Sequence, residues 1–459
     1  MSEFDYEVVV VGGGGAGLAA AASAAQSGAS VMVLEAGREL GGSTRLSGGS
    51  FLAAGTAAQR LIGIDDDVDA LYEHYMTINR WRLEPAVIRA FCDNALPTME
   101  WLETLGVEFA ASGLYQALPM SVARSHRATG GGAAIVDALR RACSEHGVDV
   151  ALANGVDGLL TEGDSVVGVT VGTDALRARS TVVTTGGFAA NSALLSEHYA
   201  DSELAGSWRW TPAPATNRGD GLRLGAQVRA STAGQNRGEL VLTSAIARDL
   251  DPFPPGWLVY VDCRGRRFID ESAPYPVTTG AVVAAGGRAW ALFDESTRRS
   301  ARPDGTATFG GGIWAADTIL AAAEAGNVES AEDPRALARG IDADPVELEA
   351  TFAACNHSYD ARHDSLYFKP AEHLAPLRTP PFYAVELRAA AVAVTGYGLR
   401  IDRDARVLGP GDSPIPRMFA AGEVTGNVLG DQYLGGGNAV GSALIFGRLA
   451  GLGAAASDA

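Results

Sequence analysis

The hydrophobic pattern at the start of the chain predicts a strand, a glycine turn, a helix and a second strand. Residues 8–11 are four consecutive valines, which is typical of a parallel strand buried on both faces, and four glycines follow them. Residues 16–25 are mostly alanine and favour a helix. A second apolar run, residues 31–34, ends on Glu35. This order predicts the first unit of a doubly wound α/β fold.

The rest of the chain continues this alternation of helical and extended patterns. Apolar residues at helical spacing predict helices over 67–106 and 134–145, and the chain ends in a helix rich in small residues. Extended patterns predict strands at 148–152, 155–160, 165–171, 180–187 and 417–421. A second buried strand ending in a glycine turn, 180–187, fits a Rossmann-like parallel sheet.

Between about residues 237 and 387 the composition changes. Prolines cluster at 252–255 and 274–276, and an acidic stretch at 325–350 reads as a solvated helix face. We therefore expect an inserted α+β cap domain over 237–392, interrupting a nucleotide-binding domain formed by 1–236 and 393–459.

The first glycine turn has the spacing of a dinucleotide-binding fingerprint. Gly12, Gly14 and Gly17 fit G-x-G-x-x-G, and each removes a Cβ where the backbone turns, approaches a pyrophosphate or packs on the strand. Glu35 follows at the distance expected for an acid that holds a ribose hydroxyl.

Two later glycine segments add to this site. Residues 422–426 follow the last strand, and residues 433–442 contain a glycine run that leads into the last helix, whose exposed N–H groups suit an anionic or carbonyl oxygen. Asp220, at the start of another predicted helix, is either its N-cap or a cofactor contact.

Composition narrows the choice of partners. The net charge of −18 disfavours nucleic acid and anionic membrane surfaces. The four cysteines show no C-x-x-C spacing, so we expect free thiols and no metal site.

Residues 8–25 are uncharged, but their glycines and alanines favour a strand, turn and helix over a transmembrane segment. The acidic first residues lack the pattern of a secretory signal, and a cytoplasmic location is expected.

Several motifs together resemble one family. The segments VVVVGGGGAGLAAA, GGSTRLSGG, TTGGFAAN, NRGDGLRLGA, GRRFIDES and AAGEVTG, followed by GGGNAVGSALIFGRLAG, resemble the flavoprotein superfamily of soluble fumarate reductases and 3-ketosteroid dehydrogenases over about residues 6–452. The resemblance implies an FAD domain interrupted by a cap domain. No histidine occurs in 41–49, where related succinate dehydrogenases attach flavin, so non-covalent FAD is expected.

The resemblance also assigns cofactor contacts. Glu35 would hold the adenosine ribose, Val156 would face the adenine through its backbone, and Glu423 would bond the ribityl chain. Ser43, Thr44, Gly48 and Gly49 would line the pyrophosphate and flavin. The other positions assigned to the cofactor are Gly42, Ser47, Gly186, Asp220, Gly422, Asn438 and Ser442.

The substrate residues favour the 3-ketosteroid Δ1-dehydrogenase branch. Tyr433 stands where fumarate reductases carry an arginine, and Ala393 and Val394 replace their paired histidines, so the dicarboxylate clamp is missing. By contrast, Tyr433-x-x-x-Gly437 resembles the closing motif of the Δ1-dehydrogenases, and the segment ending at Tyr275 resembles the one that bears their tyrosine base.

This pattern suits removal of two hydrogens next to a ketone. The Tyr433 hydroxyl and the Gly437 N–H would stabilise the enolate oxygen, Tyr275 would take the α-proton with Tyr115 as its neighbour, and flavin N5 would accept hydride. Packing alone is the alternative explanation for each of these two aromatics, Tyr275 and Tyr115. His126, beside two arginines, is better explained as structural.

The expected function is FAD-dependent α,β-dehydrogenation of a cyclic ketone, either a 3-ketosteroid or a smaller cyclohexanone such as an oxocyclohexane carboxylate. A substrate carboxylate could meet Arg45, Arg124 or Arg127, although solvation explains all three. The electron acceptor would be external: a quinone, oxygen or a carrier protein. Two alternatives stay open, an ene reductase of the fumarate or urocanate type and a non-catalytic flavin subunit that relays electrons.

Overall fold

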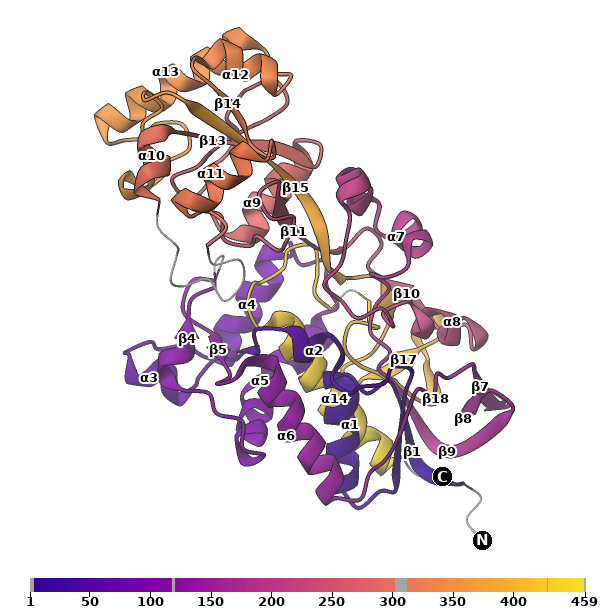
Figure 1. Cartoon of the computed structure of the whole chain (residues 1–459). Helices are drawn as coiled ribbons and strands as arrows, with labels where there is room; N and C mark the ends of the chain where they lie inside the picture. Colours follow the sequence, from indigo (N-terminus) through magenta and orange to yellow (C-terminus); the bar gives the residue numbers. More distant parts are fainter. Residues whose placement is uncertain (1–3, 118–119, 302–311, 427, 458–459) are drawn as a thin grey trace. The chain divides into compact units, whose positions relative to one another are not determined.

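The computed structural model describes residues 4–117, 120–301, 312–426 and 428–457. The chain divides into two compact units (Figure 1). The first comprises Met1–Tyr199, Thr211–Glu239 and Ala393–Ala459, and the second Ala200–Trp210 and Leu240–Val392. The segment Ala200–Trp210, predicted to belong to the first domain, lies in the second unit. Its Trp210 exchanges backbone hydrogen bonds with Ala390 (3.1 Å) and Val392 (2.8 Å), a pairing that the sequence pattern does not reveal.

The first unit is built on a mainly parallel sheet. Among the described residues, its strands run in the order β17-β18-β9-β1-β2-β6, with β7 and β8 forming a hairpin on β9. They are β1 (Tyr6–Val11), β2 (Val31–Glu35), β6 (Asp149–Leu152), β7 (Gly158–Glu162), β8 (Ser165–Val171), β9 (Asp174–Val183), β17 (Arg406–Leu408) and β18 (Pro414–Ala420). β1 pairs in parallel with β2 and β9, and β18 pairs in parallel with β9, so the predicted doubly wound fold is confirmed.

Helices cover this sheet and fill the rest of the unit (Figure 1). They are α1 (Gly15–Gln26), α2 (Gly42–Leu46), α3 (Ala57–Leu61), α4 (Val68–Ile78), α5 (Pro85–Thr104), α6 (Gly131–Glu145), α7 (Ser192–His198), α8 (Asp220–Gln227) and α14 (Asn438–Ala456). The helical pattern over 67–106 is thus two helices, α4 and α5, with a turn between them. Short elements complete the unit: η1 (Ala111–Gly113), η4 (Pro410–Asp412), β10 (Thr232–Ala233) and β16 (Gly398–Leu399).

The first and last helices pack closely because both are rich in small residues. A Cβ atom on Gly447 would lie 2.4 Å from the Ala16 carbonyl oxygen, and one on Gly451 would lie 2.2 Å from the Ala20 carbonyl oxygen. Within the described ranges, α14 alone has the length and apolar composition of a membrane span, with mean hydropathy 1.5, and 56% of that stretch is buried in the structure. This contact with α1 accounts for its apolar composition.

A small antiparallel sheet stands apart from the main one. It consists of β3 (Ser50–Leu52), β5 (Ser125–Arg127) and β4 (Leu114–Tyr115), with β5 in the middle. Ser125 lies opposite Leu52 on one side and opposite Tyr115 on the other. Because directly opposed residues in antiparallel strands point to the same face, Ser125 and Tyr115 share one face of this sheet.

The second unit is an α+β structure around an antiparallel sheet. In the part of the chain that the structure describes, this sheet has the order β11-β15-β13-β12, with β14 also pairing with β15. Its strands are β11 (Gly238–Ser244), β12 (Val259–Val261), β13 (Arg288–Asp294), β14 (Glu329–Ala331) and β15 (Phe382–Thr395). Its helices are α9 (Tyr275–Ala284), α10 (Glu295–Ser300), α11 (Ala316–Glu324), α12 (Pro334–Gly340), α13 (Pro345–Ala361), η2 (Ala200–Trp208) and η3 (Ala371–His373).

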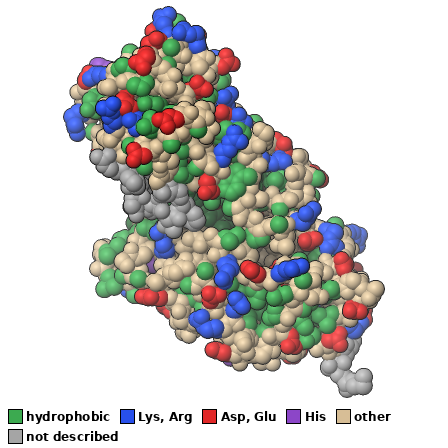
Figure 2. All heavy atoms as spheres, viewed as in Figure 1, with side chains coloured by type: hydrophobic (Ala, Val, Ile, Leu, Met, Phe, Trp, Pro, Cys, Tyr) green, Lys and Arg blue, Asp and Glu red, His purple; other side chains and the backbone are tan. Residues whose placement is uncertain are grey.

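The acidic stretch 325–350 has a structural explanation. Asp333 and Asp344 cap the amino ends of α12 and α13 by accepting backbone N–H groups, and Leu337 and Leu348 pack into the core of the second unit. On the face drawn in Figure 2, acidic and basic side chains are interspersed rather than gathered into one basic patch.

Candidate functional site

The three fingerprint glycines face different surroundings. A Cβ on Gly12 would lie 2.5 Å from the Thr184 carbonyl oxygen, and one on Gly17 would lie 1.9 Å from the Gly12 carbonyl oxygen. A Cβ on Gly14 would meet no atom within 4 Å. Gly12 and Gly17 are therefore fixed by packing, while the backbone at Gly14 is open to close approach by another group.

Glu35 is held in place by the same turn. One of its carboxylate oxygens accepts the Gly13 N–H at 2.7 Å and the other accepts the Gly37 N–H at 2.6 Å. Each carboxylate oxygen has a second lone pair, so Glu35 can still accept bonds from a ribose.

The segment 41–49 lies beside this turn. A Cβ on Gly42 would come within 3.3 Å of the Gly14 Cα, and the Thr44 side chain is buried against Gly15. Ser47 donates its hydroxyl to the Thr44 carbonyl at 2.7 Å and accepts the Gly49 N–H at 3.2 Å.

Of the remaining predicted positions in this segment, Ser43 is exposed and Gly48 is partly exposed. Gly49 takes a left-handed conformation, with φ +67°, against the backbone of Gly131 and Gly132. The segment is thus a compact turn beside Gly14.

The adenine side of the predicted site includes an arginine that the sequence did not reveal. Arg223 donates to the Val156 carbonyl oxygen at 2.8 Å and lies 3.4 Å from an Asp220 carboxylate oxygen. Asp220 is not the N-cap of α8: Gly219 occupies that position with φ +87°. The left-handed turn suits glycine, and Asp220 becomes the first helical residue.

Glu423 is anchored by groups from three separate segments. One carboxylate oxygen accepts both the backbone N–H and the hydroxyl of Thr395 at 2.8 Å, and the other accepts the Asn217 amide at 3.2 Å. Burial raises the pKa of Glu423 above its ordinary value, whereas the bonds from Thr395, Asn217 and Gly187 act in the opposite direction.

Two glycines next to these residues, one before Glu423 and one beside Asn217, adopt left-handed backbone conformations. Gly422 has φ +83° and approaches Ala16, and Gly186 has φ +73° beside Asn217. The Asn217 side-chain oxygen is buried and lacks a hydrogen-bond partner among the described residues, as does the Asn438 side-chain nitrogen. Such orphaned buried groups fit a polar ligand that supplies the missing partners.

The amino end of α14 brings several predicted residues together. Gly437 caps the helix with φ +101°, and Asn438 is fully buried, with its side-chain oxygen 2.9 Å from the Tyr75 hydroxyl. The Tyr433 hydroxyl accepts the Ala439 N–H at 3.2 Å. The Tyr433 hydroxyl and the Gly437 backbone therefore lie at the same helix end. Ser442, one turn further along α14, is buried.

The phenol of Tyr433 stays protonated. Burial raises its pKa well above 10, and the nearby Glu239 carboxylate raises it further. Its loop is fixed from α4, because Asn79, just past that helix, accepts the Gln432 N–H at 2.9 Å. Sequence reasoning missed Asn79 and Glu239, which lie far along the chain from residue 433.

The small sheet forms a platform beneath the glycine run. A Cβ on Gly437 would lie 2.7 Å from the Phe51 carbonyl carbon, and one on Gly436 would lie 2.0 Å from the Tyr115 hydroxyl oxygen. Tyr115 also shares a 2.8 Å hydrogen bond with Ser50. The structure thus places Tyr115 next to the run that follows Tyr433.

His126 lies on the opposite face of this sheet. It is buried, with its ring nitrogens 2.9 Å from the Thr56 hydroxyl and 3.0 Å from the Arg124 carbonyl oxygen. These bonds support the structural interpretation of His126.

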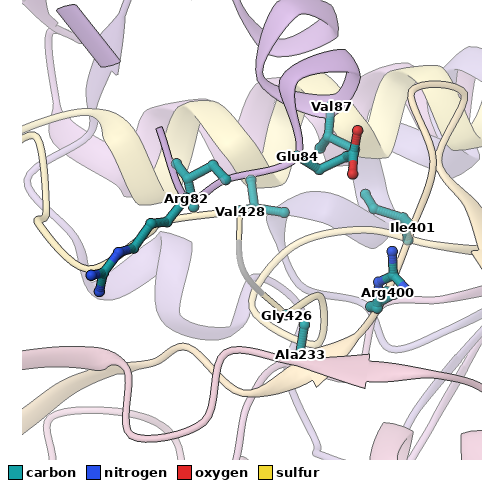
Figure 3. Close-up of a pocket in the computed structure, with 9 residues that line it drawn as sticks. Arg82, Glu84, Val87, Ala233, Arg400, Ile401, Gly426 and Val428 are labelled. Carbon is teal, nitrogen blue, oxygen red and sulfur yellow. The ribbon is translucent and has the colours of Figure 1, made fainter. Parts of the chain in front are cut away.

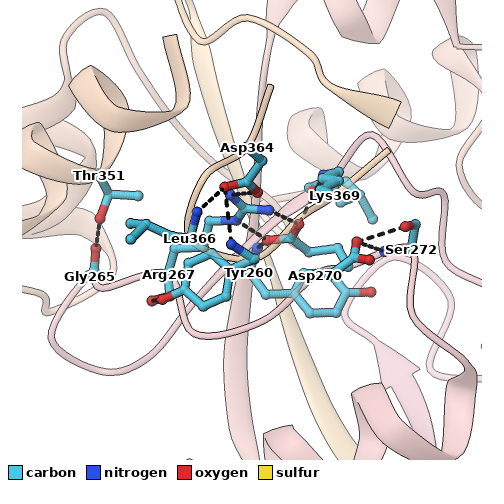
Figure 4. A network of polar contacts seen from close by, with 12 residues as sticks. Tyr260, Gly265, Arg267, Asp270, Ser272, Thr351, Asp364, Leu366 and Lys369 are labelled. Carbon is cyan, nitrogen blue, oxygen red and sulfur yellow. Dashed lines mark hydrogen bonds and ion pairs between the residues drawn. The ribbon is translucent and has the colours of Figure 1, made fainter. Parts of the chain in front are cut away.

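Tyr275 belongs to the second unit, where it begins α9 and packs edge-on against Phe253 at 5.7 Å between ring centroids. The motif before it supplies several residues of a polar network in this unit (Figure 4). Glu271 accepts two bonds from Arg267, at 2.8 and 2.9 Å, and one from Lys369 at 2.9 Å. The GRRFIDES motif therefore holds the segment that leads to Tyr275.

The arginines considered for a substrate carboxylate have partners of their own. Arg45 pairs with Asp137 at 3.0 Å, and Arg124 is a buried partner of Asp66, with both side chains 2% exposed. Arg124 is therefore held in a buried ion pair and is not solvated. The Arg127 guanidinium lies 5.2 Å from the centre of the Tyr115 ring.

Tyr397, just before β16, also has contacts of its own. It stacks on His198 at 3.9 Å between ring centroids, and its hydroxyl lies 2.7 Å from the Thr232 hydroxyl.

A pocket of about 130 Å³ lies elsewhere in the first unit (Figure 3). It is lined by residues that include Arg82, Glu84, Arg400 and Gly426. Arg82 lies 3.7 Å from Asp431, and Arg400 pairs with Asp412, so both cations already have acidic partners. Apart from Gly426, which ends the predicted segment 422–426, the pocket contains none of the predicted site residues. Across the described ranges, no group of three or more histidine, cysteine, aspartate or glutamate side chains is placed to hold a metal ion.

Comparison with known proteins identifies the family. Residues 7–440 match the family model described as "FAD binding domain". An NADH:fumarate oxidoreductase of Klebsiella pneumoniae is 32% identical over 97% of this chain and 47% of its own length, so the chain spans about half of that relative. A 4-oxocyclohexanecarboxylate 2-dehydrogenase of Sinomonas cyclohexanicum is 28% identical over 97% of this chain and 92% of its own length.

A solved structure resembles the whole chain. The 3-ketosteroid Δ4-(5α)-dehydrogenase of Rhodococcus jostii RHA1, solved with 4-androstene-3,17-dione, matches with a TM-score of 0.83 and 25% identity, covering 100% of this chain and 98% of that one. The chain therefore belongs to the FAD-binding superfamily of fumarate reductases and 3-ketosteroid dehydrogenases.

Proposed function

We propose that this flavoprotein dehydrogenates a cyclic ketone between its α and β carbons. The observation that carries the proposal is the position of the Tyr433 hydroxyl at the amino end of α14, beside the Gly437 backbone. A protonated phenol, a glycine N–H and the positive end of a 19-residue helix together suit an oxygen that gains negative charge.

FAD would bind non-covalently along the first unit. Gly14 and the segment 41–49 would hold the pyrophosphate, Glu35 the adenosine ribose, and Glu423 the ribityl chain. The open backbone at Gly14 and the orphaned Asn217 oxygen support this assignment. Bound FAD would supply the hydride acceptor.

Side chains and backbone of the protein would take the α-proton and stabilise the ketone oxygen. The Tyr433 hydroxyl would donate to the ketone oxygen, and the Gly437 N–H, which has no hydrogen-bond acceptor among the described residues, would donate to the same atom. Each donor of this kind typically contributes about 3 kcal/mol to transition-state stabilisation. Tyr275 is the proposed base for the α-proton, and Tyr115 is proposed to assist it.

The substrate class is a ring ketone of steroid size or smaller. Two relatives support this choice because their names describe dehydrogenases of ring ketones. They are the 4-oxocyclohexanecarboxylate 2-dehydrogenase and a 3-oxosteroid 1-dehydrogenase of Mycolicibacterium smegmatis. A carboxylate on a smaller ring would have Arg127, whose guanidinium lies over the Tyr115 ring, as a candidate partner.

A second candidate function is reduction of an unsaturated acid. It is favoured by the 32% identity to the NADH:fumarate oxidoreductase. Against it stands Tyr433, an uncharged side chain that cannot form the bidentate ion pair by which an arginine holds a carboxylate.

The test is an anaerobic assay of the purified FAD-loaded protein. Cyclohexanone, 4-oxocyclohexanecarboxylate and 4-androstene-3,17-dione are each added to the oxidised protein, and bleaching of the flavin absorbance is followed. Bleaching with a ring ketone, together with a product lacking two hydrogens, supports the proposal.

Cyclohexanecarboxylate, which has no ketone, is the matched control and should give no bleaching. Re-oxidation of the dithionite-reduced protein by fumarate or urocanate, without ketone oxidation, would instead establish the second candidate. An FAD-loaded protein that responds to neither set would contradict both candidates and favour an electron-relay subunit.

A further inference from the structure

We infer that Ser125 is a positioning residue that orients and strengthens the Gly437 N–H as a donor to the substrate oxygen. The inference rests on the proposed function and adds a residue to its site. It comes from one contact: the Ser125 hydroxyl donates to the Gly436 carbonyl oxygen at 2.5 Å.

This contact acts on the donor through a single peptide group. The Gly436 carbonyl and the Gly437 N–H are opposite ends of one planar amide, so fixing the carbonyl also fixes the direction of the N–H. Glycines flank this amide on both sides, and Gly435 and Gly437 have φ of +97° and +101°. Because glycine backbones have wide conformational freedom, such an amide needs an external restraint to hold one orientation.

The hydrogen bond also changes the donor strength. A donor on an amide carbonyl draws electron density from the nitrogen, so chains of hydrogen bonds polarise one another and each bond becomes stronger. Ser125 is fully buried, which places this effect in a low-dielectric environment. The Gly437 N–H is then a better partner for a developing enolate oxygen than an unassisted amide.

The small sheet explains why Ser125 reaches this amide. Ser125 on β5 lies directly opposite Tyr115 on β4, so both side chains leave the same face. Tyr115 approaches the Cα of the same Gly436, while β3 packs under Gly437. The small sheet thus contacts Gly436 and Gly437, and its hydrogen bond to the Gly436 carbonyl comes from Ser125.

Ser231 provides a matched control. Its hydroxyl also donates to a glycine carbonyl in the first unit, that of Gly409, at 2.8 Å. Ser231→Ala therefore removes the same kind of bond away from residues 433–442. Ser125→Thr keeps a hydroxyl on β5 and tests for rescue.

The experiment compares these variants as FAD-loaded proteins, with 4-nitrophenol as a mimic of the enolate oxygen. We expect Ser125→Ala to lower kcat for ring-ketone oxidation about ten-fold and to weaken 4-nitrophenol binding by a similar factor, with KM nearly unchanged. The Gly437 amide resonance in ¹⁵N spectra should shift in Ser125→Ala. Ser231→Ala should match the wild type in each measurement, and Ser125→Thr should recover most of the loss.

Equal behaviour of Ser125→Ala and Ser231→Ala, with an active wild type, would overturn this inference and leave the proposed function intact. A wild type that neither oxidises ketones nor binds 4-nitrophenol would overturn both. If Ser125→Ala does not retain FAD, Ser125→Cys, a weaker donor of similar size, replaces it. Its kcat should then fall below that of the wild type, and an unchanged kcat would contradict the inference.

Discussion

Two glycine turns in the first unit lead into helices that pack on each other, yet their surroundings differ. In the turn before α1, Gly14 has open space where a side chain would stand. In the turn before α14, the positions of side chains on Gly436 and Gly437 are already taken by Tyr115 and by the backbone of β3. At Gly14, the backbone of the first turn is accessible to a bulky ligand. The second turn packs against Tyr115 and β3, and its Gly437 lies at the amino end of α14.

The comparison shows that a glycine run does not define a site by itself. The first turn needs only its own spacing and Glu35, because a pyrophosphate is bound by backbone and helix dipole. The second turn gains its proposed chemistry from Tyr433 and from the sheet beneath it. By our proposal, the same residue type thus serves cofactor binding in one turn and substrate activation in the other.

Gly17→Ala should break the first turn most severely. Its new Cβ would lie 1.9 Å from the Gly12 carbonyl oxygen, so the strand and helix must separate. We expect a loss of more than about 3 kcal/mol in the free energy of unfolding, since overpacking against rigid backbone cannot relax easily. Urea unfolding and the FAD content of the purified protein measure this, and wild-type stability would contradict the packing role.

Tyr433→Phe should remove the proposed chemistry of the second turn while the first turn keeps its cofactor. We expect kcat for ketone oxidation to fall about a hundred-fold, as for loss of one oxyanion donor. The affinity for FAD should not change. Because the pKa of Tyr433 is raised well above 10, the wild type should also keep this donor up to pH 10. Stopped-flow flavin reduction measures both effects, and an undiminished kcat would refute the role of Tyr433.

Gly14→Ala separates binding from folding within the first turn. The new methyl group meets no protein atom within 4 Å, so the free energy of unfolding of the FAD-free protein should change by less than about 0.5 kcal/mol. FAD affinity should fall about ten-fold, because the methyl group occupies the path of the pyrophosphate. Fluorescence titration of the apoprotein gives the Kd. An unchanged Kd would place the pyrophosphate elsewhere.

Glu423→Gln should give the smallest effect, visible only as a change in pH dependence. Because its pKa is raised, Glu423 keeps its proton in the folded protein to a higher pH than in the unfolded chain, where a Glu has a pKa of about 4.3. The unfolding free energy contributed by Glu423 therefore falls as pH rises from the unfolded to the folded pKa and is level above it.

Glutamine does not titrate, so this decline should disappear in the variant. Rotation of the Asn217 amide would let its orphaned oxygen accept a bond from the new side chain. Urea unfolding of the FAD-free protein from pH 4 to 8 compares the two slopes, and parallel curves would show that burial does not dominate at Glu423.

Much of the first unit could be predicted because its signals are local. The valine run, the spacing of Gly12, Gly14 and Gly17, and Glu35 at the end of the next strand lie within 30 residues and specify a parallel βαβ unit. The N-cap of α8 was wrong by one residue, because the left-handed turn at Gly219 outweighs the capping preference of Asp220.

The supporting residues of the second turn could not be read from the sequence. Asn79, Ser125 and Glu239 lie about 200 to 350 residues before the glycine run and carry no motif of their own. Arg124 looked like a solvated arginine because its partner Asp66 is 58 residues away. Each of these contacts exists only after the fold brings distant segments together.

The amino-acid sequence alone determined the family, the FAD fold and the positions of both glycine turns, because hydrophobic periodicity and glycine spacing act over short distances along the chain. Only the tertiary structure decided which side chains surround each turn: open space at Gly14, the Ser125 hydroxyl on the Gly436 carbonyl, and the Tyr433 hydroxyl at the start of α14. The physical reason is that hydrogen bonds and close packing depend on distances in space, which local patterns do not encode.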